Sequence, residues 1–131
     1  MNKDIKIQIV KLVDNFDENY RMAAFGDSAD EYSVENYVIL QRAYTFDKQD
    51  SKLGMDTYYF EFNNQANSGY GICEKVILNN NCIEFSFLDE ENNICKLNLI
   101  LDKDSYDNSI LERYLSLILG DTFTSLNLSK N

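Results

Sequence analysis

The sequence contains no histidine. Histidine is the usual general base near neutral pH, the commonest metal-ligating side chain and the base in Ser–His and Cys–His nucleophile pairs. Its absence excludes most hydrolase and metalloenzyme designs. We therefore expect no bound metal, no cofactor and no catalytic residues, and the sequence favours a protein that works by binding another protein.

Long apolar runs are also lacking. No stretch approaches the roughly 20 residues of a membrane-spanning helix. Lys3, Asp4 and Lys6 stand where a secretion signal would be apolar, so we expect a cytoplasmic protein. The three cysteines, Cys73, Cys82 and Cys95, lie in apolar strand-like runs, which is typical of reduced thiols in a cytosolic core. A Cys73–Cys82 bridge is the alternative.

Positive charge is scarce. The chain has 12 Lys and Arg against 22 Asp and Glu, a net charge of -10. Nucleic acids and anionic membranes are bound through clustered Lys and Arg, so neither is an expected direct partner. The negative charge favours a partner with a basic surface, or it serves solubility alone.

The length and hydrophobic share predict one domain covering residues 1–131. Alternation with a period of two predicts strands over residues 4–13, 19–25, 37–44, 57–62, 72–78, 82–88 and 94–101. The run 37–44 is almost continuously apolar as far as Gln41, which is typical of a central strand covered on both faces. Because nothing alternates as β-α-β, we predict an α+β fold: an antiparallel β-sheet of about five to seven strands packed by a C-terminal α-helix.

A period of 3.6 predicts this helix over residues 105–119. Asp104, Ser105 or a capping box at Ser109 fits its start, and Gly120 fits its end. The tail from Asp121 is polar and is expected to fray. The apolar stripe of the helix is expected to cover one face of the sheet, with Leu111, Leu115 and Ile118 packed on Ile83, Phe85, Leu97 and Leu99.

One loop gathers three carboxylates, Asp47, Asp50 and Asp56. Such a set can bind a hard cation through oxygen, or serve a carboxylate-based enzyme if two acids converge in a pocket. The spacing is not that of an EF-hand, and two lysines interrupt it, so helix caps and turn bonds are the favoured interpretation. Arg42 can orient a ligand carboxylate, but pairing with a nearby Asp is expected.

Over half of the excess negative charge lies in residues 14–36. This segment holds seven acidic residues against Arg21 alone, a net charge of -6, together with Tyr20 and Phe25. Aromatic anchors among carboxylates suit contact with a basic protein surface. The residues predicted to bind a partner are Asp27, Asp30, Glu31, Tyr32 and Glu35. A solvated loop is the equally weighted alternative.

The middle of the chain resembles the bacterial immunity protein 10 family, most strongly over residues 37–78. The resemblance rests on Leu40-Gln41-Arg42-Ala43, Phe46-Asp47, Gln49-Asp50, Leu53-Gly54-Met55-Asp56, Tyr59, Gln65 and Ser68-Gly69-Tyr70-Gly71. Much of this motif is expected to hold the fold, because Gln41 and Arg42 lie on an apparently buried strand and glycines answer backbone demands. The motif residues taken as structural are Gln41, Arg42, Asp47, Asp50, Gly54, Asp56, Gln65, Gly69, Tyr70 and Gly71.

The resemblance implies a cytoplasmic antidote in a polymorphic toxin system, which binds the toxin encoded beside it and either plugs its active site or binds beside that site and blocks the substrate. If that toxin is a nuclease, an acidic protein competes directly with nucleic acid for its basic groove. Two alternatives stay open. One is a small acidic adaptor module with no toxin partner, and the other is a carboxylate-based enzyme that uses the loop from Asp47 to Asp56.

Overall fold

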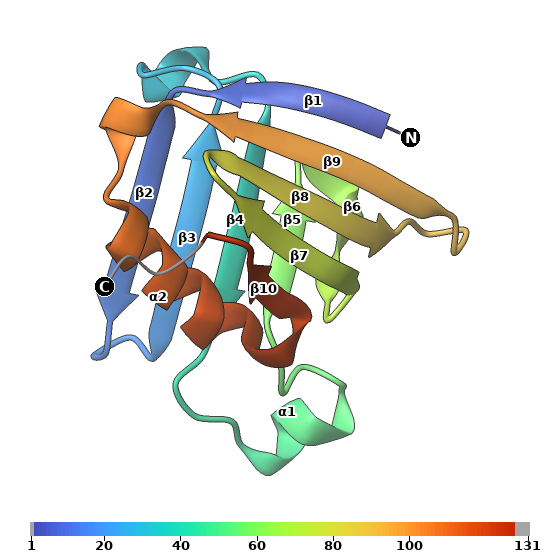
Figure 1. Ribbon diagram of the computed structural model, residues 1–131. Coiled ribbons are helices and arrows are strands. Elements are labelled where there is room, and N and C mark those ends of the chain that lie inside the picture. Colours follow the sequence, from blue (N-terminus) through green and yellow to red (C-terminus); the bar gives the residue numbers. More distant parts are fainter. Residues whose placement is uncertain (1, 128–131) are drawn as a thin grey trace.

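Two five-stranded sheets face each other in the computed structural model, which describes residues 2–127, with only the backbone of Gln65 and Ala66. Sheet A has the order β1 (Asn2–Ile7), β9 (Ile94–Leu101), β8 (Cys82–Leu88), β7 (Cys73–Asn79) and β10 (Phe123–Ser125). Sheet B has the order β2 (Ile9–Asn15), β3 (Tyr20–Gly26), β4 (Tyr37–Arg42), β5 (Tyr59–Phe62) and β6 (Asn64–Tyr70). The strands of sheet A cross in front of those of sheet B (Figure 1). The helices are α1 (Lys48–Lys52) and α2 (Asn108–Leu119), with 3-10 turns at Glu31–Ser33, Lys103–Ser105 and Gly120–Thr122. The predicted α+β class is confirmed.

The strand predicted over residues 4–13 is divided between the two sheets. Ile5 and Ile7 are buried from sheet A, whereas Val10 and Leu12 pack against the core from sheet B. The inward positions therefore change from odd to even at Gln8, whose N–H donates to the carbonyl of Gly26 (2.9 Å). This change of phase is why one run of alternating residues serves two sheets.

Both edges of sheet A carry parallel pairs, which the alternation pattern does not predict. β1 runs parallel to β9, and β10 runs parallel to β7. The segment expected to fray from Asp121 instead forms a 3-10 turn followed by β10. Leu126 N–H extends this pairing by donating to the carbonyl of Leu78 (2.8 Å). Pairing with the edge of sheet A therefore orders this segment, although its polar composition predicts fraying.

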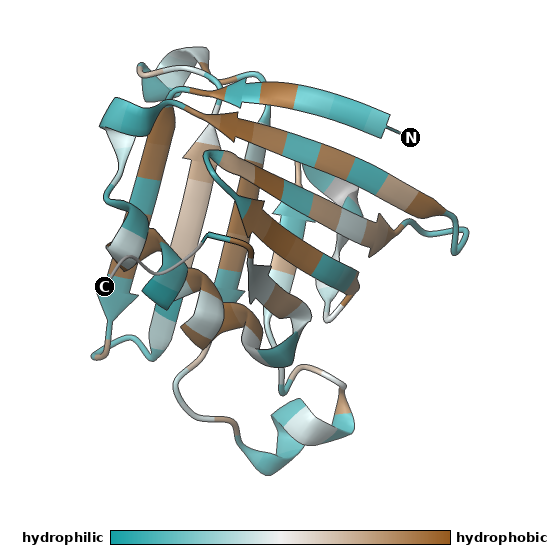
Figure 2. Cartoon of the chain, in the orientation of Figure 1, coloured by the Kyte–Doolittle hydropathy of each residue, from teal (hydrophilic) through white to brown (hydrophobic). Residues whose placement is uncertain are grey.

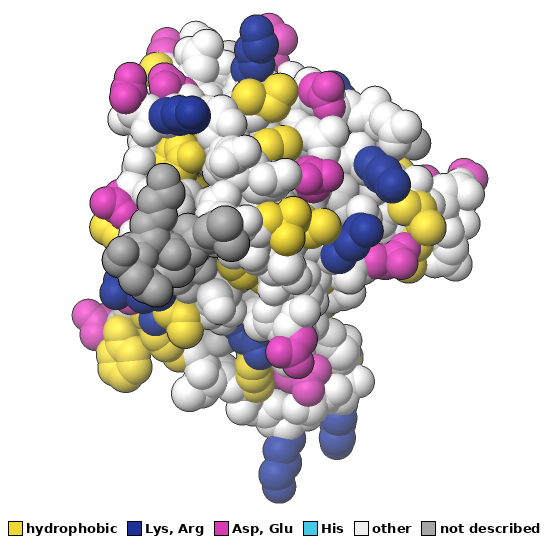
Figure 3. Space-filling view, in the orientation of Figure 1, with side chains coloured by type: hydrophobic (Ala, Val, Ile, Leu, Met, Phe, Trp, Pro, Cys, Tyr) yellow, Lys and Arg dark blue, Asp and Glu magenta, His cyan; other side chains and the backbone are white. Residues whose placement is uncertain are grey.

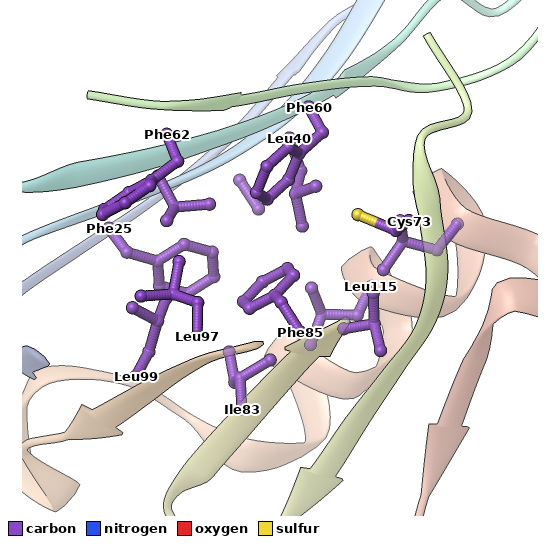
Figure 4. Close-up of a cluster of buried hydrophobic side chains, with 14 of the residues drawn as sticks. Phe25, Leu40, Phe60, Phe62, Cys73, Ile83, Phe85, Leu97, Leu99 and Leu115 are labelled. Atoms are coloured by element: carbon purple, nitrogen blue, oxygen red, sulfur yellow. The ribbon is translucent and has the colours of Figure 1, made fainter. Parts of the chain in front are cut away.

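The core lies between the inner faces of the sheets (Figure 4). Brown segments alternate with teal ones along the middle of β9 (Figure 2), and the buried residues of this strand are Cys95, Leu97, Leu99 and Leu101. Phe60 of sheet B lies 4.8 Å from Phe87 and 5.5 Å from Phe85 of sheet A, between ring centroids. These contacts join the two sheets through one aromatic cluster.

Helix α2 begins later than predicted. Its N-cap is Asp107, whose carboxylate accepts the N–H of Ile110 (3.0 Å), so the predicted caps Asp104, Ser105 and Ser109 are wrong. Gly120 ends the helix with φ of 59°, as expected. Leu111, Leu115 and Ile118 are fully buried in the core that holds Ile83, Phe85, Leu97 and Leu99. The helix packs chiefly against β3, β4 and β10, however, and not across β8 and β9.

Candidate partner-binding surface

The outer face of sheet B is the most apolar exposed face of the two sheets. Alternation from the buried residues places on it Ile9, Lys11, Val13 and Asn15 of β2; Tyr20, Met22, Ala24 and Gly26 of β3; Tyr37, Ile39 and Gln41 of β4; Tyr59 and Glu61 of β5; and Ser68 and Tyr70 of β6. Of these, only Lys11 and Glu61 carry a formal charge. We call this set the outer face of sheet B.

The outer face of sheet A is different. It carries Asp4 and Lys6 of β1, Lys75 of β7, Glu84 of β8 and Lys96 of β9, and two apolar residues of β9, Ile94 and Ile100, are exposed beside them. Figure 3 views the molecule from this side, and charges of both signs are scattered over it. The solvated face of a sheet normally carries many polar and charged residues, as sheet A does here. The low charge on the outer face of sheet B is therefore the unusual feature.

The central strand β4 shows the contrast most clearly. Val38 and Leu40 point inward and are fully buried, while Tyr37, Ile39 and Gln41 remain partly exposed on the outside. The expectation that this strand is covered on both faces is therefore met only on its inner side. Exposed apolar patches on a protein surface mark interaction sites, so the outer side of β4, with Ile39 between Tyr37 and Gln41, is a candidate contact surface.

Glu61 lies within this outer face and is gripped by two tyrosines. The hydroxyl of Tyr59 donates to Oε1 (2.7 Å), and the hydroxyl of Tyr37 donates to Oε2. The hydrogen bond to Glu61, with burial second, raises the pKa of Tyr37 to about 12. Burial, and then the bond to Glu61, raises the pKa of Tyr59. Both hydroxyls therefore stay protonated and hold the carboxylate in one orientation.

Two shallow hollows lie on this side of the molecule, one lined in part by Tyr37 and the other in part by Tyr59. One, of about 200 Å³, is lined mainly by apolar side chains, including Ile9, Val34 and Ile39. The other, of about 170 Å³, is more polar and lies toward α1, with Gln41, Tyr59 and Tyr70 in its wall. The rings of Tyr59 and Tyr70 are 5.3 Å apart between centroids, and Tyr70 is 41% exposed. These hollows give the face concave places that a partner's side chains can fill.

Several family-motif residues surround the second hollow, and α1 explains two of them. Asp47 is the N-cap of α1 and accepts the N–H of Asp50 (2.8 Å), while the carboxylate of Asp50 accepts the N–H of Asp47 (2.9 Å). This reciprocal capping box stabilises a helix too short to persist alone. The carboxylates of Asp47 and Asp50 are thus used as caps, as the favoured interpretation predicted. Asp56 lies exposed beyond the helix.

The motif glycines occupy positions where a side chain would strain the backbone or clash with a neighbour. Gly54 and Gly71 have φ of 70° and 63°, which side-chain-bearing residues rarely adopt. Gly69 has no such φ, but a Cβ there would lie 2.9 Å from Cγ2 of Ile72. The side chain of Gln65 lies outside the described residues.

Arg42 does not pair with an Asp as expected. Its Nη1 donates to the carbonyl of Ile118 near the end of α2 (3.1 Å), and its guanidinium lies 5.5 Å from the ring of Phe46. A cation at a helix C-terminus is attracted to the partial negative charge of the last carbonyls and stabilises the helix end. Arg42 therefore joins sheet B, α2 and the α1 loop.

The acidic segment 14–36 does not form one patch. Asp14, Asp17 and Glu18 lie at the β2–β3 end, and the remaining acids lie in the β3–β4 connection at the other end of β3 (Figure 1). A seven-residue strand spans about 23 Å, so the two acidic ends are well beyond a Debye length apart at physiological salt. The apolar outer face lies between them.

Within the β3–β4 connection, Asp27 and Asp30 support the loop. Asp27 accepts the N–H groups of Glu35 (2.9 Å) and Asn36 (3.0 Å) and the amide of Asn36 (2.9 Å). Burial alone would raise the pKa of Asp27, but these hydrogen bonds outweigh it and lower the pKa. Asp30 caps the 3-10 turn by accepting the N–H of Tyr32 (3.1 Å).

The other three predicted partner-binding residues point outward. Tyr32 is 93% exposed, and Glu35 is exposed. Glu31 pairs with Lys11 at 3.3 Å, but both side chains are largely in solvent, so this ion pair contributes little stability. Glu31, Tyr32 and Glu35 are therefore available to a partner, beside the apolar hollow that Glu31 also lines.

Sequence reasoning missed Glu61, Tyr37 and Tyr59 as a set. The sequence does indicate that Tyr59 and Glu61 share one outward side of their strand, because they alternate with the inward Phe60 and Phe62. Tyr37 begins the continuously apolar strand. What the pattern lacks is the register that places Ile39 of β4 directly opposite Glu61 of β5.

No His, Cys, Asp and Glu cluster able to hold a metal ion occurs within residues 2–127. Cys73, Cys82 and Cys95 are free thiols, so the alternative of a Cys73–Cys82 bridge is wrong. Burial raises the pKa of Cys73 to about 12, which makes it a poor nucleophile. In the described part of the chain, neither helix has the length and apolar character needed to cross a membrane.

The family model for Immunity protein 10 matches residues 6–106. The match covers more than half of the chain and includes nine of the ten strands in part or whole, so the chain belongs to this family. It ends before α2, which places the helix outside the matched region. No curated protein matches the sequence.

Proposed function

We propose that this protein binds one cognate bacterial toxin in the cytoplasm and neutralises it by occluding its working surface. Membership of the Immunity protein 10 family supports an immunity role. The observation that carries the binding mode is the outer face of sheet B, where only two of the residues are charged and the outer side of β4 is partly exposed. Nothing in this mechanism needs catalysis, a cofactor, nucleic acid or a membrane.

The charge distribution supports a partner with a basic surface. Both ends of β3 are acidic, and the chain as a whole carries -10. Such charge steers a basic partner and raises the association rate, while apolar and aromatic contacts supply most of the affinity. The predicted residues Glu31, Tyr32 and Glu35 fit this steering role, and Asp27 and Asp30 shape the loop that presents them.

The test uses the toxin encoded immediately upstream of the gene for this protein. Cells that express this toxin should survive when the protein is co-expressed, and the two purified proteins should form a complex. A toxin from an unrelated system is the specificity control. Survival without a complex would contradict occlusion, and a complex with a non-toxic neighbour in place of the toxin would favour the adaptor alternative.

The carboxylate-based enzyme is the weaker alternative on structural grounds. Two of its three acids, Asp47 and Asp50, already accept the N–H groups that form the cap of α1. A carboxylate held in a capping box is not directed toward a substrate. The geometry therefore favours binding over catalysis at this loop.

A further inference from the structure

The carboxylate of Glu61 is held by two hydrogen bonds and has no ion-pair partner within the described residues. Its two oxygens each accept one tyrosine hydroxyl, which leaves further lone pairs free on both. No Lys or Arg within residues 2–127 lies within 4.0 Å of its carboxylate. The side chain is partly exposed, and the two tyrosine hydroxyls hold its carboxylate in one orientation.

We infer that Glu61 accepts a Lys or Arg side chain of the toxin, with Tyr37, Tyr59 and Tyr70 as the aromatic walls around that cation. This inference rests on the proposed function and names the contact at its centre. A cation held between a carboxylate and tyrosine rings gains both ionic attraction and cation–π attraction. Aliphatic side chains next to the cation would fill the hollow beside Ile39.

A second copy of this chain does not suit the face. An isologous dimer through this face would set the same surface of two copies together, with acidic loops at both of its ends. The net charge of -10 on each copy opposes such pairing. The complementary occupant is a different protein that is basic where this one is acidic.

The acidic loops adjoin this face and enlarge the surface that a partner can contact. Four strand spacings of about 4.8 Å and a strand length of about 23 Å give an area of about 450 Å². A stable interface buries about 800 Å² on each partner. The flanking loops extend this area, because Glu31, Tyr32 and Glu35 are exposed on one side and Asp17 and Glu18 on the other.

The experiment measures binding of the purified upstream-encoded toxin to the wild-type protein and to Glu61→Gln. Glutamine keeps the shape and removes the charge, so the dissociation constant should rise at least about tenfold, mainly through faster dissociation. Glu84→Gln is the matched control, because Glu84 is exposed on β8 of the opposite sheet, and it should change the dissociation constant less than about twofold.

A second variant, Tyr59→Phe, keeps the ring and removes the hydroxyl that orients Oε1. It should weaken binding less than Glu61→Gln does, while thermal unfolding verifies that both variants are folded. If wild type binds and Glu61→Gln binds equally well, this inference is overturned and the immunity function stands. If wild type itself fails to bind the toxin, the proposed function and this inference are both overturned.

Discussion

The hydroxyl of Tyr58 bridges both backbone groups of Cys73. It donates to the carbonyl of Cys73 (3.1 Å) and accepts the N–H of the same residue (3.0 Å). Tyr58 is 3% exposed and immediately precedes β5 of sheet B, whereas Cys73 begins β7 of sheet A. One phenol therefore satisfies two backbone groups where the chain passes from one sheet to the other.

Tyr58→Phe should destabilise the protein by about 1–3 kcal/mol, because it leaves a buried donor and a buried acceptor without their partner. The free energy of unfolding, measured by denaturant titration, checks this value. Tyr32→Phe is the control, since Tyr32 is 93% exposed, and it should change stability by less than about 0.5 kcal/mol. Equal stability of the two variants would show that the bridge is dispensable.

Alkaline pH should destabilise the fold through ionisation of Tyr58 and Tyr37. Burial raises the pKa of Tyr58 to about 12, and the hydrogen bond to Glu61 raises that of Tyr37 to about 12. Tyrosines in the unfolded chain lose their proton near pH 10, so folding retains protons that the unfolded state releases. The stabilising contribution is complete below about pH 10 and is lost as the pH rises toward 12.

Phenolate absorbance provides the measurement. Of the nine tyrosines, Tyr37 and Tyr58 should ionise late, and the variants Tyr37→Phe and Tyr58→Phe should each remove one late-titrating group. A wild-type titration in which all tyrosines ionise together near pH 10, while the protein remains folded, would contradict the burial of Tyr58 and the hydrogen bond between Tyr37 and Glu61.

The core face of α2 offers a matched pair of truncations. Leu115 is fully buried, and Leu117, two residues further along the same helix, is 47% exposed. Leu115→Ala should cost about 2–5 kcal/mol, because it removes buried methyl groups and leaves a cavity. Leu117→Ala should cost far less in the same denaturant melts. Similar losses of stability for both variants would contradict the assignment of Leu115 to the core face and Leu117 to the exposed face of α2.

Much of the fold is predictable because it depends on local pattern. Alternation locates most of the strands, and the 3.6-residue period locates α2, since both record which side chains are buried. The two-sheet arrangement is not local. It depends on the change of phase at Gln8 and on parallel pairing by β1 and β10 at the edges of sheet A, and neither can be seen in the sequence of one strand.

The candidate site is harder to predict for a related reason. Composition locates the acidic segment, but the path of β3 separates its charges into two groups. Side chains such as Asp27 then turn out to bond their own loop. The carboxylate of Glu61 becomes notable only after pairing brings β4 alongside β5, because Tyr37 lies 24 positions away from it in the sequence.

The exposed acids of the β3–β4 loop should control how fast the toxin associates. Glu31 and Glu35 can be reversed to Lys without loss of a buried contact, whereas Asp30 caps the 3-10 turn and is better left intact. The double variant Glu31→Lys with Glu35→Lys should associate about tenfold more slowly at low salt, because charge reversal removes steering. Its melting temperature should stay close to that of wild type.

The salt dependence of association distinguishes long-range electrostatic steering by Glu31 and Glu35 from direct contact with the toxin. The Debye length falls from about 10 Å at 0.1 M salt to about 3 Å at 1 M, so the difference between the variant and wild type should shrink as salt rises. Asp27→Ala is the informative counterpart, because it removes the acceptor of three loop hydrogen bonds and should lower stability by about 1–2 kcal/mol. If the double variant associates as fast as wild type at low salt, the acidic loop is a solvated connection, and recognition rests on the outer face of sheet B alone.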